Sequence, residues 1–270
     1  MYRADLHCHS TCSDGTSTPV ELLHLAKNVG LSALSITDHD TLDAYTEETY
    51  REAESLQVKL FMGVEFSARH LGHNIHILGY GVTRTNSILE FCKKHIKRRK
   101  DRNLAILQKL RRLSLPIEEE ELYKYGENRV IGRPHIAQIM VEKGYIKSIQ
   151  EAFDRYLGDS KCCYVIDDSF TVEETIDQIH QAHGKAFLAH PHVIRKTQIL
   201  TSLLKLNFDG IECYYSLLGP KQEKKWLKIA HEKNLLISGG SDFHGKVKPQ
   251  IQLGCSYVDE NAVEKIFNAF

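Results

Sequence analysis

The chain has 270 residues, no long hydrophobic run and no net charge, and each absence excludes a class of protein. No uninterrupted apolar run approaches the roughly 20 residues that a membrane-spanning helix needs. The 35 Lys and Arg residues balance the 35 Asp and Glu residues, so no overall field draws the chain toward nucleic acid or a membrane surface. Any preference for an anionic ligand must therefore be local.

The N-terminus lacks the apolar stretch of a signal peptide, and the cysteines lack the spacing of a disulfide framework. The first residues, Met-Tyr-Arg-Ala-Asp, lead directly into a motif. The seven cysteines are odd in number, show no repeated spacing and include the adjacent pair Cys162 and Cys163. We therefore expect a cytoplasmic protein. No obligate protein partner is evident from the sequence.

Short apolar, β-branched runs alternate with longer amphipathic stretches along most of the chain. Strands are predicted at residues 33–37, 60–66, 75–80, 185–189, 210–214 and 235–239. Helices are predicted at residues 19–28, 42–56, 172–183, 199–206, 222–233 and 260–267, with Thr18, Thr41 and Asp259 as candidate N-caps. This alternation predicts parallel strands joined by crossover helices. A closed or nearly closed (β/α) barrel fits the length better than an open sheet.

One long stretch interrupts the alternation. Residues 85–163 contain no convincing strand, and residues 87–113 form a long, charged helical pattern. Further helical pieces are predicted from residues 118, 134 and 149. We interpret residues 85–163 as a helical insertion that covers the mouth of the barrel, and residues 1–84 and 164–270 as the barrel itself.

Side chains that bind metals occur in short clusters, most of them directly after a predicted strand. The clusters contain Asp5, His7, His9 and Asp14; Asp38, His39 and Asp40; His190 and His192; Asp242 and His244. In barrels of parallel strands, the carboxyl ends of the strands form the rim where active sites lie. Each cluster alone could be turn or loop chemistry, but several at strand ends predict a shared site for more than one divalent ion.

Individual positions support a metal site to different degrees. His7 and His9 are two apart in an extended segment, so both rings can reach one ion, and Asp5 could orient one of them. Glu65 closes an apolar strand, where a carboxylate without a partner is costly. A metal supplies that partner, and two carboxylate oxygens can bridge two ions. His76, alone in an apolar strand, is more often a core histidine than a ligand.

The motifs, in their order along the chain, resemble those of the polymerase and histidinol phosphatase (PHP) superfamily. They are Asp-Leu-His-Cys-His-Ser, Asp14, Thr-Asp-His-Asp, Gly-Val-Glu-Phe-Ser, His76, Ala-His-Pro-His and Gly-Ser-Asp-Phe-His. The resemblance implies a distorted seven-stranded (β/α) barrel that binds two or three divalent ions (Mn²⁺, Zn²⁺, Fe²⁺ or Mg²⁺). The Gly-Arg-Pro-His stretch at residues 132–135 is similar to a branch that hydrolyses AMP and nucleoside 3′,5′-bisphosphates, some members of which trim RNA from the 5′ end.

The same resemblance implies three ion positions. The first would be held by His7, His9, Glu65 and Asp242, the second by Glu65, His76 and His190, and the third by Asp14, His39 and His244. Asp14 departs from the pattern, because many relatives carry a histidine there. A carboxylate at this position favours Mg²⁺ or Mn²⁺ over Zn²⁺.

The mechanism expected from this ligand set is attack on phosphorus by a hydroxide that bridges two ions. Metal ions lower the pKa of bound water from 15.7 toward roughly 7. Arginine forks bind phosphate oxygens bidentately. The residues expected to contact the phosphate are Arg99, Arg133, His135 and His192. His192, or a water bound at His39, could protonate the leaving group.

The expected ligand is a small phosphorylated nucleotide, with a short RNA as the alternative, and other functions stay open. A 5′–3′ exonuclease would use the same chemistry in a longer groove, with Tyr123, Tyr125, Tyr145 and Tyr156 as stacking or packing residues. A histidinol-phosphate phosphatase is less favoured because of the insertion. A metal-free PHP binding module is the alternative from a different class.

Overall fold

The computed structural model describes residues 1–126, 129–166 and 170–268, and its strands form two sheets. The three-stranded sheet is parallel and consists of β1 (Ala4–Cys8), β2 (Ala33–Ile36) and β3 (Lys59–Leu60). The five-stranded sheet consists of β4 (Gly63–His70), β5 (His73–Tyr80), β6 (Lys185–Leu188), β7 (Gly210–Tyr215) and β8 (Leu236–Gly240).

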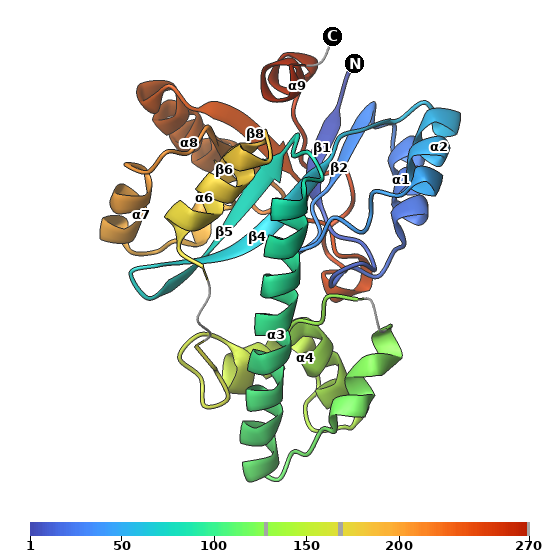
Figure 1. The fold of residues 1–270 in the computed structure, drawn as a ribbon, viewed down its shortest axis with the longest axis vertical. Helices are drawn as coiled ribbons and strands as arrows, with labels where there is room; N and C mark the ends of the chain where they lie inside the picture. Colours follow the sequence, from blue (N-terminus) through green and yellow to red (C-terminus); the bar gives the residue numbers. More distant parts are fainter. Residues whose placement is uncertain (127–128, 167–169, 269–270) are drawn as a thin grey trace.

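Backbone hydrogen bonds join the two sheets along both of their long sides. On one side, the N–H of Asp242, just after β8, donates to the carbonyl of His7 in β1 at 2.7 Å. On the other side, the N–H of Glu65 in β4 donates to the carbonyl of Asp38 after β2 at 3.2 Å. The sheets therefore close into a distorted α/β barrel of the expected (β/α) class (Figure 1).

The expectation of uniformly parallel strands is wrong for β5. This strand runs antiparallel to both β4 and β6. Leu71 and Gly72 connect β4 to β5 with φ angles of +48° and +81°, the left-handed pair that tight hairpin turns require. The predicted strand at 60–66 is also divided, because residue 60 ends β3 and β4 starts at residue 63 and continues to residue 70. The long β4–β5 hairpin extends away from the rest of the barrel in Figure 1.

Helices cover the outside of the barrel close to where the periodicity predicts them. They are α1 (Pro19–Asn28), α2 (Glu47–Leu56), α6 (Val172–Gln181), α7 (Thr197–Leu203), α8 (Pro220–Lys233) and α9 (Glu260–Phe267), with the short turns η3 (Pro191–Val193) and η4 (Gly245–Val247). Thr18 caps α1 and Asp259 caps α9, as expected.

The start of α2 differs from the prediction. The helix begins at Glu47 with Thr46 as its N-cap, not at residue 42 after Thr41. The preceding Tyr45 is buried, and its hydroxyl donates to the carbonyls of Ile36 at 2.7 Å and Phe61 at 2.9 Å. Burial of this side chain between two strand ends holds residues 42–45 in a turn, closed by the Tyr45 N–H and the Leu42 carbonyl at 3.2 Å, so the helix starts later.

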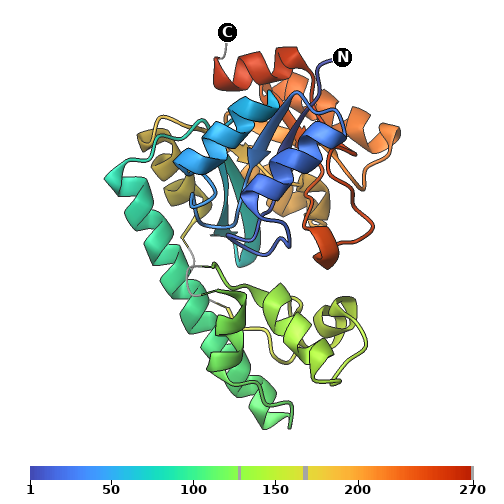
Figure 2. The ribbon, with the colours of Figure 1, turned by 90° about the vertical axis from the view of Figure 1, so that its right-hand side faces the viewer.

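Within its described residues, the insertion consists of helices joined by turns and loops, and it contains no strand. Its elements are α3 (Asn86–Arg112), η1 (Glu119–Tyr125), α4 (Arg133–Glu142), α5 (Ile149–Ala152) and η2 (Phe153–Leu157). In Figures 1 and 2, α3 runs along the barrel and continues below it, where the other elements pack against its far half. A separate hydrophobic cluster that includes Ile106, Leu110 and Ile136 forms their core. This separate core supports boundaries near residues 85 and 163, which stay a prediction.

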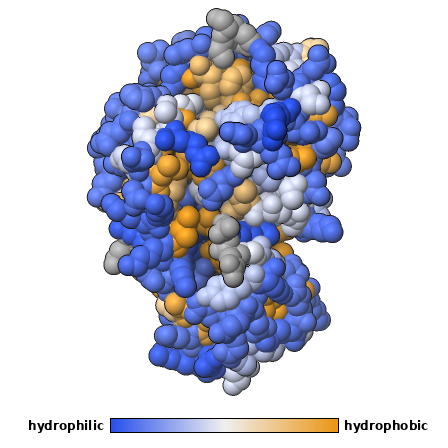
Figure 3. Space-filling model, turned by 45° about the vertical axis from the view of Figure 1, so that its right-hand side comes forward, coloured by the Kyte–Doolittle hydropathy of each residue, from blue (hydrophilic) through white to orange (hydrophobic). Residues whose placement is uncertain are grey.

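The surface narrows between the barrel and the insertion. Figure 3 shows this waist, with hydrophobic side chains gathered beside it. Among the described residues, no helix is both long enough and apolar enough to cross a membrane.

Candidate metal centre

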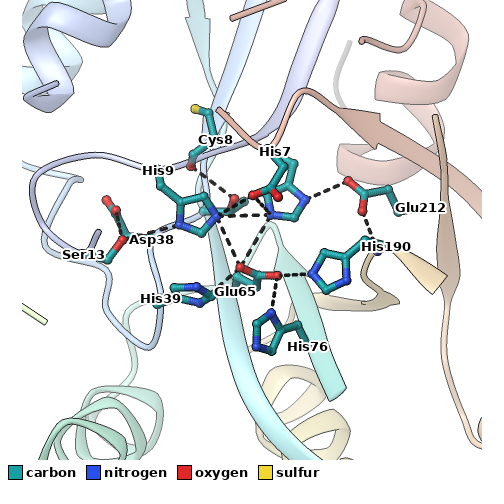
Figure 4. A network of polar contacts seen from close by, with 12 residues as sticks. His7, Cys8, His9, Ser13, Asp38, His39, Glu65, His76, His190 and Glu212 are labelled. Atoms are coloured by element: carbon teal, nitrogen blue, oxygen red, sulfur yellow. Dashed lines mark hydrogen bonds and ion pairs between the residues drawn. The ribbon is translucent and has the colours of Figure 1, made fainter. Parts of the chain in front are cut away.

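Glu65 lies at the centre of the histidine and carboxylate cluster, with only 1% of its surface exposed (Figure 4). Its Oε1 atom lies 3.0 Å from His76 Nδ1 and 2.9 Å from His190 Nε2. Its Oε2 atom faces three further ring nitrogens: His39 Nδ1 at 3.1 Å, His9 Nε2 at 3.3 Å and His7 Nε2 at 3.6 Å. The two oxygens therefore address two different groups of nitrogens, as a bridging carboxylate would.

The first group combines two imidazoles with two carboxylates. The Nε2 atoms of His7 and His9 lie 3.3 Å apart, and Asp242 Oδ1 lies 3.4 Å and 3.3 Å from them. Nδ1 of His7 lies 2.8 Å from Glu212 Oε1 and donates its hydrogen there. Fixing the hydrogen on Nδ1 leaves the Nε2 lone pair for a metal, which is how metal-binding histidines are commonly oriented.

The second group consists of His76 and His190, which face Glu65 Oε1. The third group consists of Asp14, His39 and His244, and it lies beside His9. Asp14 Oδ1 is 3.3 Å from His244 Nε2, and Asp14 Oδ2 is 3.8 Å from His39 Nε2. The Nδ1 atom of His244 lies 2.8 Å from the backbone carbonyl of Asp242, which can only accept, so Nε2 is again the atom available to a metal. The structure thus brings all the predicted ligands together in three adjacent groups. Their assignment to individual ions stays a prediction.

The charges of the cluster fit a cation site. Burial alone would raise the pKa of Glu65, but His76, His39 and His7 hold it well below its usual range. Burial likewise opposes ionisation of Asp242, while Lys248, His244 and His7 lower its pKa. Both carboxylates are therefore ionised at neutral pH. The same carboxylates raise the pKa of His7 and His9. A divalent cation that replaces the imidazole protons would find ring nitrogens and carboxylate oxygens as its donor set.

The backbone turns sharply where several of these residues leave their strands. His190, Asp242 and Asp40 have φ angles of +27°, +55° and +57°, which are uncommon for residues other than glycine. Such conformations persist where surrounding contacts hold them, often at functional sites. Glu65 and His76 differ, because they lie inside strands. His76 lies within β5, as expected, and Glu65 lies near the start of β4 and does not close its strand, because β4 continues into the hairpin.

Glu212 is a candidate functional residue that the sequence motifs do not identify. It is fully buried in β7, accepts from Nδ1 of His7, and its Oε2 accepts the backbone N–H of His190 at 2.6 Å. It thereby orients ligands of two groups. The signal was present, because Glu212 is the only charged residue in the strand Gly-Ile-Glu-Cys-Tyr-Tyr. Asp5 was expected to orient an imidazole, but it accepts from the backbone N–H groups of His7 and Ser241 instead.

Two further missed residues fix the orientation of Asp242. The hydroxyl of Tyr215 and the ammonium of Lys248 both donate to Asp242 Oδ2, at 2.6 Å and 2.5 Å. This leaves Oδ1 facing His7 and His9. Neither residue lies in a recognisable motif, so only the structure identifies them.

A cavity of about 720 Å³ lies beside the centre and is shared by the barrel and the insertion. Asp14, His39, His76 and His244 line one wall, and Arg99, Arg102 and Arg133 line the wall formed by the insertion. Arg99 Nε donates to Asp40 Oδ2 at 2.5 Å, and its second terminal nitrogen donates to Ser67 Oγ at 2.8 Å. Arg102 was not among the predicted residues.

The remaining predicted phosphate contacts are placed unequally. Arg133 lines the cavity and donates to the carbonyl of Leu157 at 3.1 Å. His135 was expected to point inward beside it, but its Nδ1 accepts the N–H of Gly132 and its ring packs on Tyr125. His192 is half-buried, with its ring 4.4 Å from that of Tyr215. Neither histidine is among the described residues that line the cavity.

Comparisons with known proteins agree with this geometry. The PHP domain model matches residues 5–249. The 5′-3′ exoribonuclease Rnm of Escherichia coli K12 is 34% identical over 93% of this chain and 87% of its own length. The 3′,5′-nucleoside bisphosphate phosphatase of Chromobacterium violaceum is 28% identical over 90% of this chain and 88% of its own.

A solved structure shows the same likeness in three dimensions. It is a Bifidobacterium adolescentis protein inferred to be a metal-dependent phosphoesterase, with a TM-score of 0.88 and 30% identity, covering 98% of this chain and 95% of the other. The expected class, a metal-dependent phosphoester hydrolase, is confirmed. With the family model spanning most of the sequence, the chain belongs to the PHP domain family.

Proposed function

We propose that this chain hydrolyses phosphomonoesters of small nucleotides, such as AMP or a nucleoside 3′,5′-bisphosphate. The observation that carries the proposal is Glu65, whose two oxygens face separate nitrogen groups beside a cavity lined by arginines. A volume of about 720 Å³ lies within the range of small-molecule sites. Positive charge on one wall and metal ligands on the other suit a ligand that carries a phosphate.

Two or three divalent ions would be held by the residues already described. Glu65 would serve the first and second positions, completed by His7, His9 and Asp242 and by His76 and His190. Asp14, His39 and His244 would hold the third. When bound, such ions make water a better nucleophile by lowering its pKa and stabilise charge on phosphoryl oxygens.

The chain's own contribution is to hold the phosphate and to keep the ligands in place. Arg99 is held by Asp40 and Ser67, so its guanidinium keeps one orientation at the cavity wall. Arg133 approaches from the start of α4. Arginine forks in such positions bind phosphate oxygens bidentately. A phosphate contact or proton transfer by His192 would come from the side of Tyr215.

The second candidate is 5′–3′ exonuclease activity on short RNA, which the likeness to the Escherichia coli exoribonuclease favours. A strand-binding groove usually offers a row of stacking aromatics. Tyr123, Tyr125, Tyr145 and Tyr156 do not line the cavity; its aromatic residues among those described are Phe153 and Tyr215. This lining supports a mononucleotide over a longer strand.

A substrate screen separates the two functions. The protein reconstituted with Mn²⁺ is incubated with AMP, a 3′,5′-bisphosphate, histidinol phosphate and a 5′-phosphorylated RNA, and phosphate and nucleotide release are measured. We expect the mononucleotides to be hydrolysed and Asp242→Asn to be inactive yet folded. Degradation of RNA without hydrolysis of any mononucleotide would establish the exonuclease instead. Full activity of Asp242→Asn would remove this residue from the centre.

The arginine wall has its own test. Arg133→Ala is expected to raise KM for the mononucleotide about 10- to 100-fold with little change in kcat, because a charge-assisted contact contributes roughly 1.5–3 kcal/mol. Arg155→Ala is the matched control, since Arg155 is exposed and pairs only locally with Glu151. An unchanged KM in Arg133→Ala would exclude Arg133 from the phosphate site.

We also propose that the protein acts in the cytoplasm. All seven cysteines are free thiols in the structure, four of them buried. Free thiols in this number suit a reducing compartment. Fractionation of cells that produce the tagged protein would test this, and recovery of the tagged protein in an extracytoplasmic fraction would contradict it.

A further inference from the structure

We infer that Arg129, from the insertion, is a positioning residue for the third ion position, and that it couples docking of the insertion to binding of that ion. The inference rests on the proposed function, because it concerns the ligand Asp14. It adds a role for the insertion beyond lining the cavity.

Asp14 lies in a turn without helix or strand, unlike Glu65 and His76. The turn folds tightly, because a Cβ at Gly15 would lie 2.1 Å from the carbonyl oxygen of His9. On its barrel side, Asp38 Oδ1 accepts from the N–H of Ser10 at 2.8 Å and from the hydroxyl of Ser13 at 2.5 Å. The position of Asp14 therefore depends on side chains that hydrogen-bond to the turn, and not on strand pairing.

On its other side, the turn accepts hydrogen bonds from the insertion. Arg129 Nε donates to the carbonyl of Ser13 at 2.5 Å, and a terminal nitrogen of the same guanidinium donates to the carbonyl of Gly15. These carbonyls flank Asp14 on both sides. The N–H of Val130 also donates to the carbonyl of Cys12 at 2.9 Å. A planar, rigid fork that holds two carbonyls fixes their relative orientation, which a lysine cannot do.

These hydrogen bonds set the direction of the Asp14 carboxylate. With its flanking carbonyls turned toward Arg129, Asp14 points its own oxygens toward His244 Nε2 at 3.3 Å and His39 Nε2 at 3.8 Å. The Arg129 guanidinium contacts the carbonyls of the turn and lies over the ring of Tyr125, and none of these contacts involves a ligand of the first two positions. Loss of its fork should loosen the third position and leave the first two intact.

The experiment measures ions bound per chain, independently of turnover. Metal-free protein is titrated with Mn²⁺ by calorimetry, and bound metal is counted by elemental analysis after gel filtration. We expect three equivalents in the wild type and loss of the weakest in Asp14→Asn. Arg129→Ala should weaken that ion about 10- to 100-fold, as for partners that orient metal ligands. Arg129→Lys should recover less than half of the lost affinity on a logarithmic scale.

Controls separate positioning from a general loss of fold. Arg155→Ala removes an exposed arginine from the same insertion and should keep three equivalents. Hydrogen exchange of residues 129–142 should slow on addition of the third equivalent in the wild type and not in Asp14→Asn. Unchanged affinity for all three ions in Arg129→Ala would overturn the inference. So would a wild type that binds two ions and hydrolyses nucleotides, an outcome that leaves the proposed function standing.

Discussion

At the scale of single residues, the metal ligands could be predicted from their residue types and spacing. The residues that orient these ligands could not. His7, His9 and Asp242 occur in short motifs at two-residue spacing, so the sequence predicts that they converge. Glu212 and Tyr215 act through hydrogen bonds between segments remote in the chain, and Lys248 acts through a loop contact with Asp242. No local pattern specifies such contacts. Only the lone charge in an apolar strand pointed to Glu212.

Glu212→Gln tests whether this support matters. The substitution keeps the shape of the side chain but removes the charge that stabilises the Nδ1 hydrogen of His7. We expect Mn²⁺ affinity at the first two positions to fall about 10- to 100-fold, measured by titration calorimetry. Glu232→Gln, at an exposed glutamate of α8 paired only with Lys228, is the control. Equal affinities in both variants would show that His7 orients itself without Glu212.

At the scale of elements, features that depend on neighbouring residues were predictable. Thr18 and Asp259 cap their helices through bonds to residues three positions on, which the sequence shows directly. The direction of β5 was not predictable in this way. The residues between the two expected strands continue the ladder in the hairpin, so no helical crossover intervenes. Tyr45 delays α2 through contacts with two separate strand ends, which also lies outside any local pattern.

The start of α4 should make the insertion sensitive to pH. Burial lowers the pKa of His135 to about 4, from an ordinary value of 6.5. The folded chain therefore keeps this ring neutral while the unfolded chain takes up a proton below pH 6.5. Its stabilising contribution is complete above pH 6.5 and is lost as the pH falls toward 4, by about 3 kcal/mol in total.

His135→Asn should remove this dependence, because the amide oxygen of asparagine can accept the N–H of Gly132 in place of Nδ1. The free energy of unfolding is measured by urea denaturation between pH 7.5 and 4.5, with chelator present throughout so that metal binding does not contribute. We expect the wild type to lose more stability than His135→Asn across this range. The exposed His231→Asn should behave like the wild type. Parallel pH profiles for all three proteins would refute the role assigned to His135.

At the scale of the whole molecule, the centre is where barrel and insertion meet. Strands from both sheets, and the loops where the two sheets meet, contribute the candidate ligands. Helices α3 and α4 supply the arginines of the cavity wall. The class of fold was predictable because strand–helix alternation and motif order are properties of the whole sequence. The sequence predicted that the insertion covers the mouth of the barrel, but not which residues line the cavity between them. The position of the insertion depends on contacts between distant residues, such as Arg99 with Asp40.

Removal of metal should therefore lower the stability of the whole molecule. Without ions, the buried carboxylates of Glu65 and Asp242 keep only histidine, lysine and tyrosine partners. Ligand at 100 times its Kd contributes about 2.7 kcal/mol, so chelation is expected to lower Tm by roughly 5–10 °C. Differential scanning calorimetry of the Mn²⁺-loaded protein, with and without EDTA, measures the change. The same Tm in both samples would mean that the centre binds no ion under these conditions.

The most direct measurement is anomalous X-ray diffraction from crystals grown with Mn²⁺, recorded above the manganese absorption edge. We expect one peak between Glu65 Oε2 and the ring nitrogens of His7 and His9, and a second between Glu65 Oε1 and the ring nitrogens of His76 and His190. Density at only one oxygen of Glu65 would contradict its bridging role. The absence of any peak near Glu65, in crystals soaked well above the Kd, would contradict the metal centre itself.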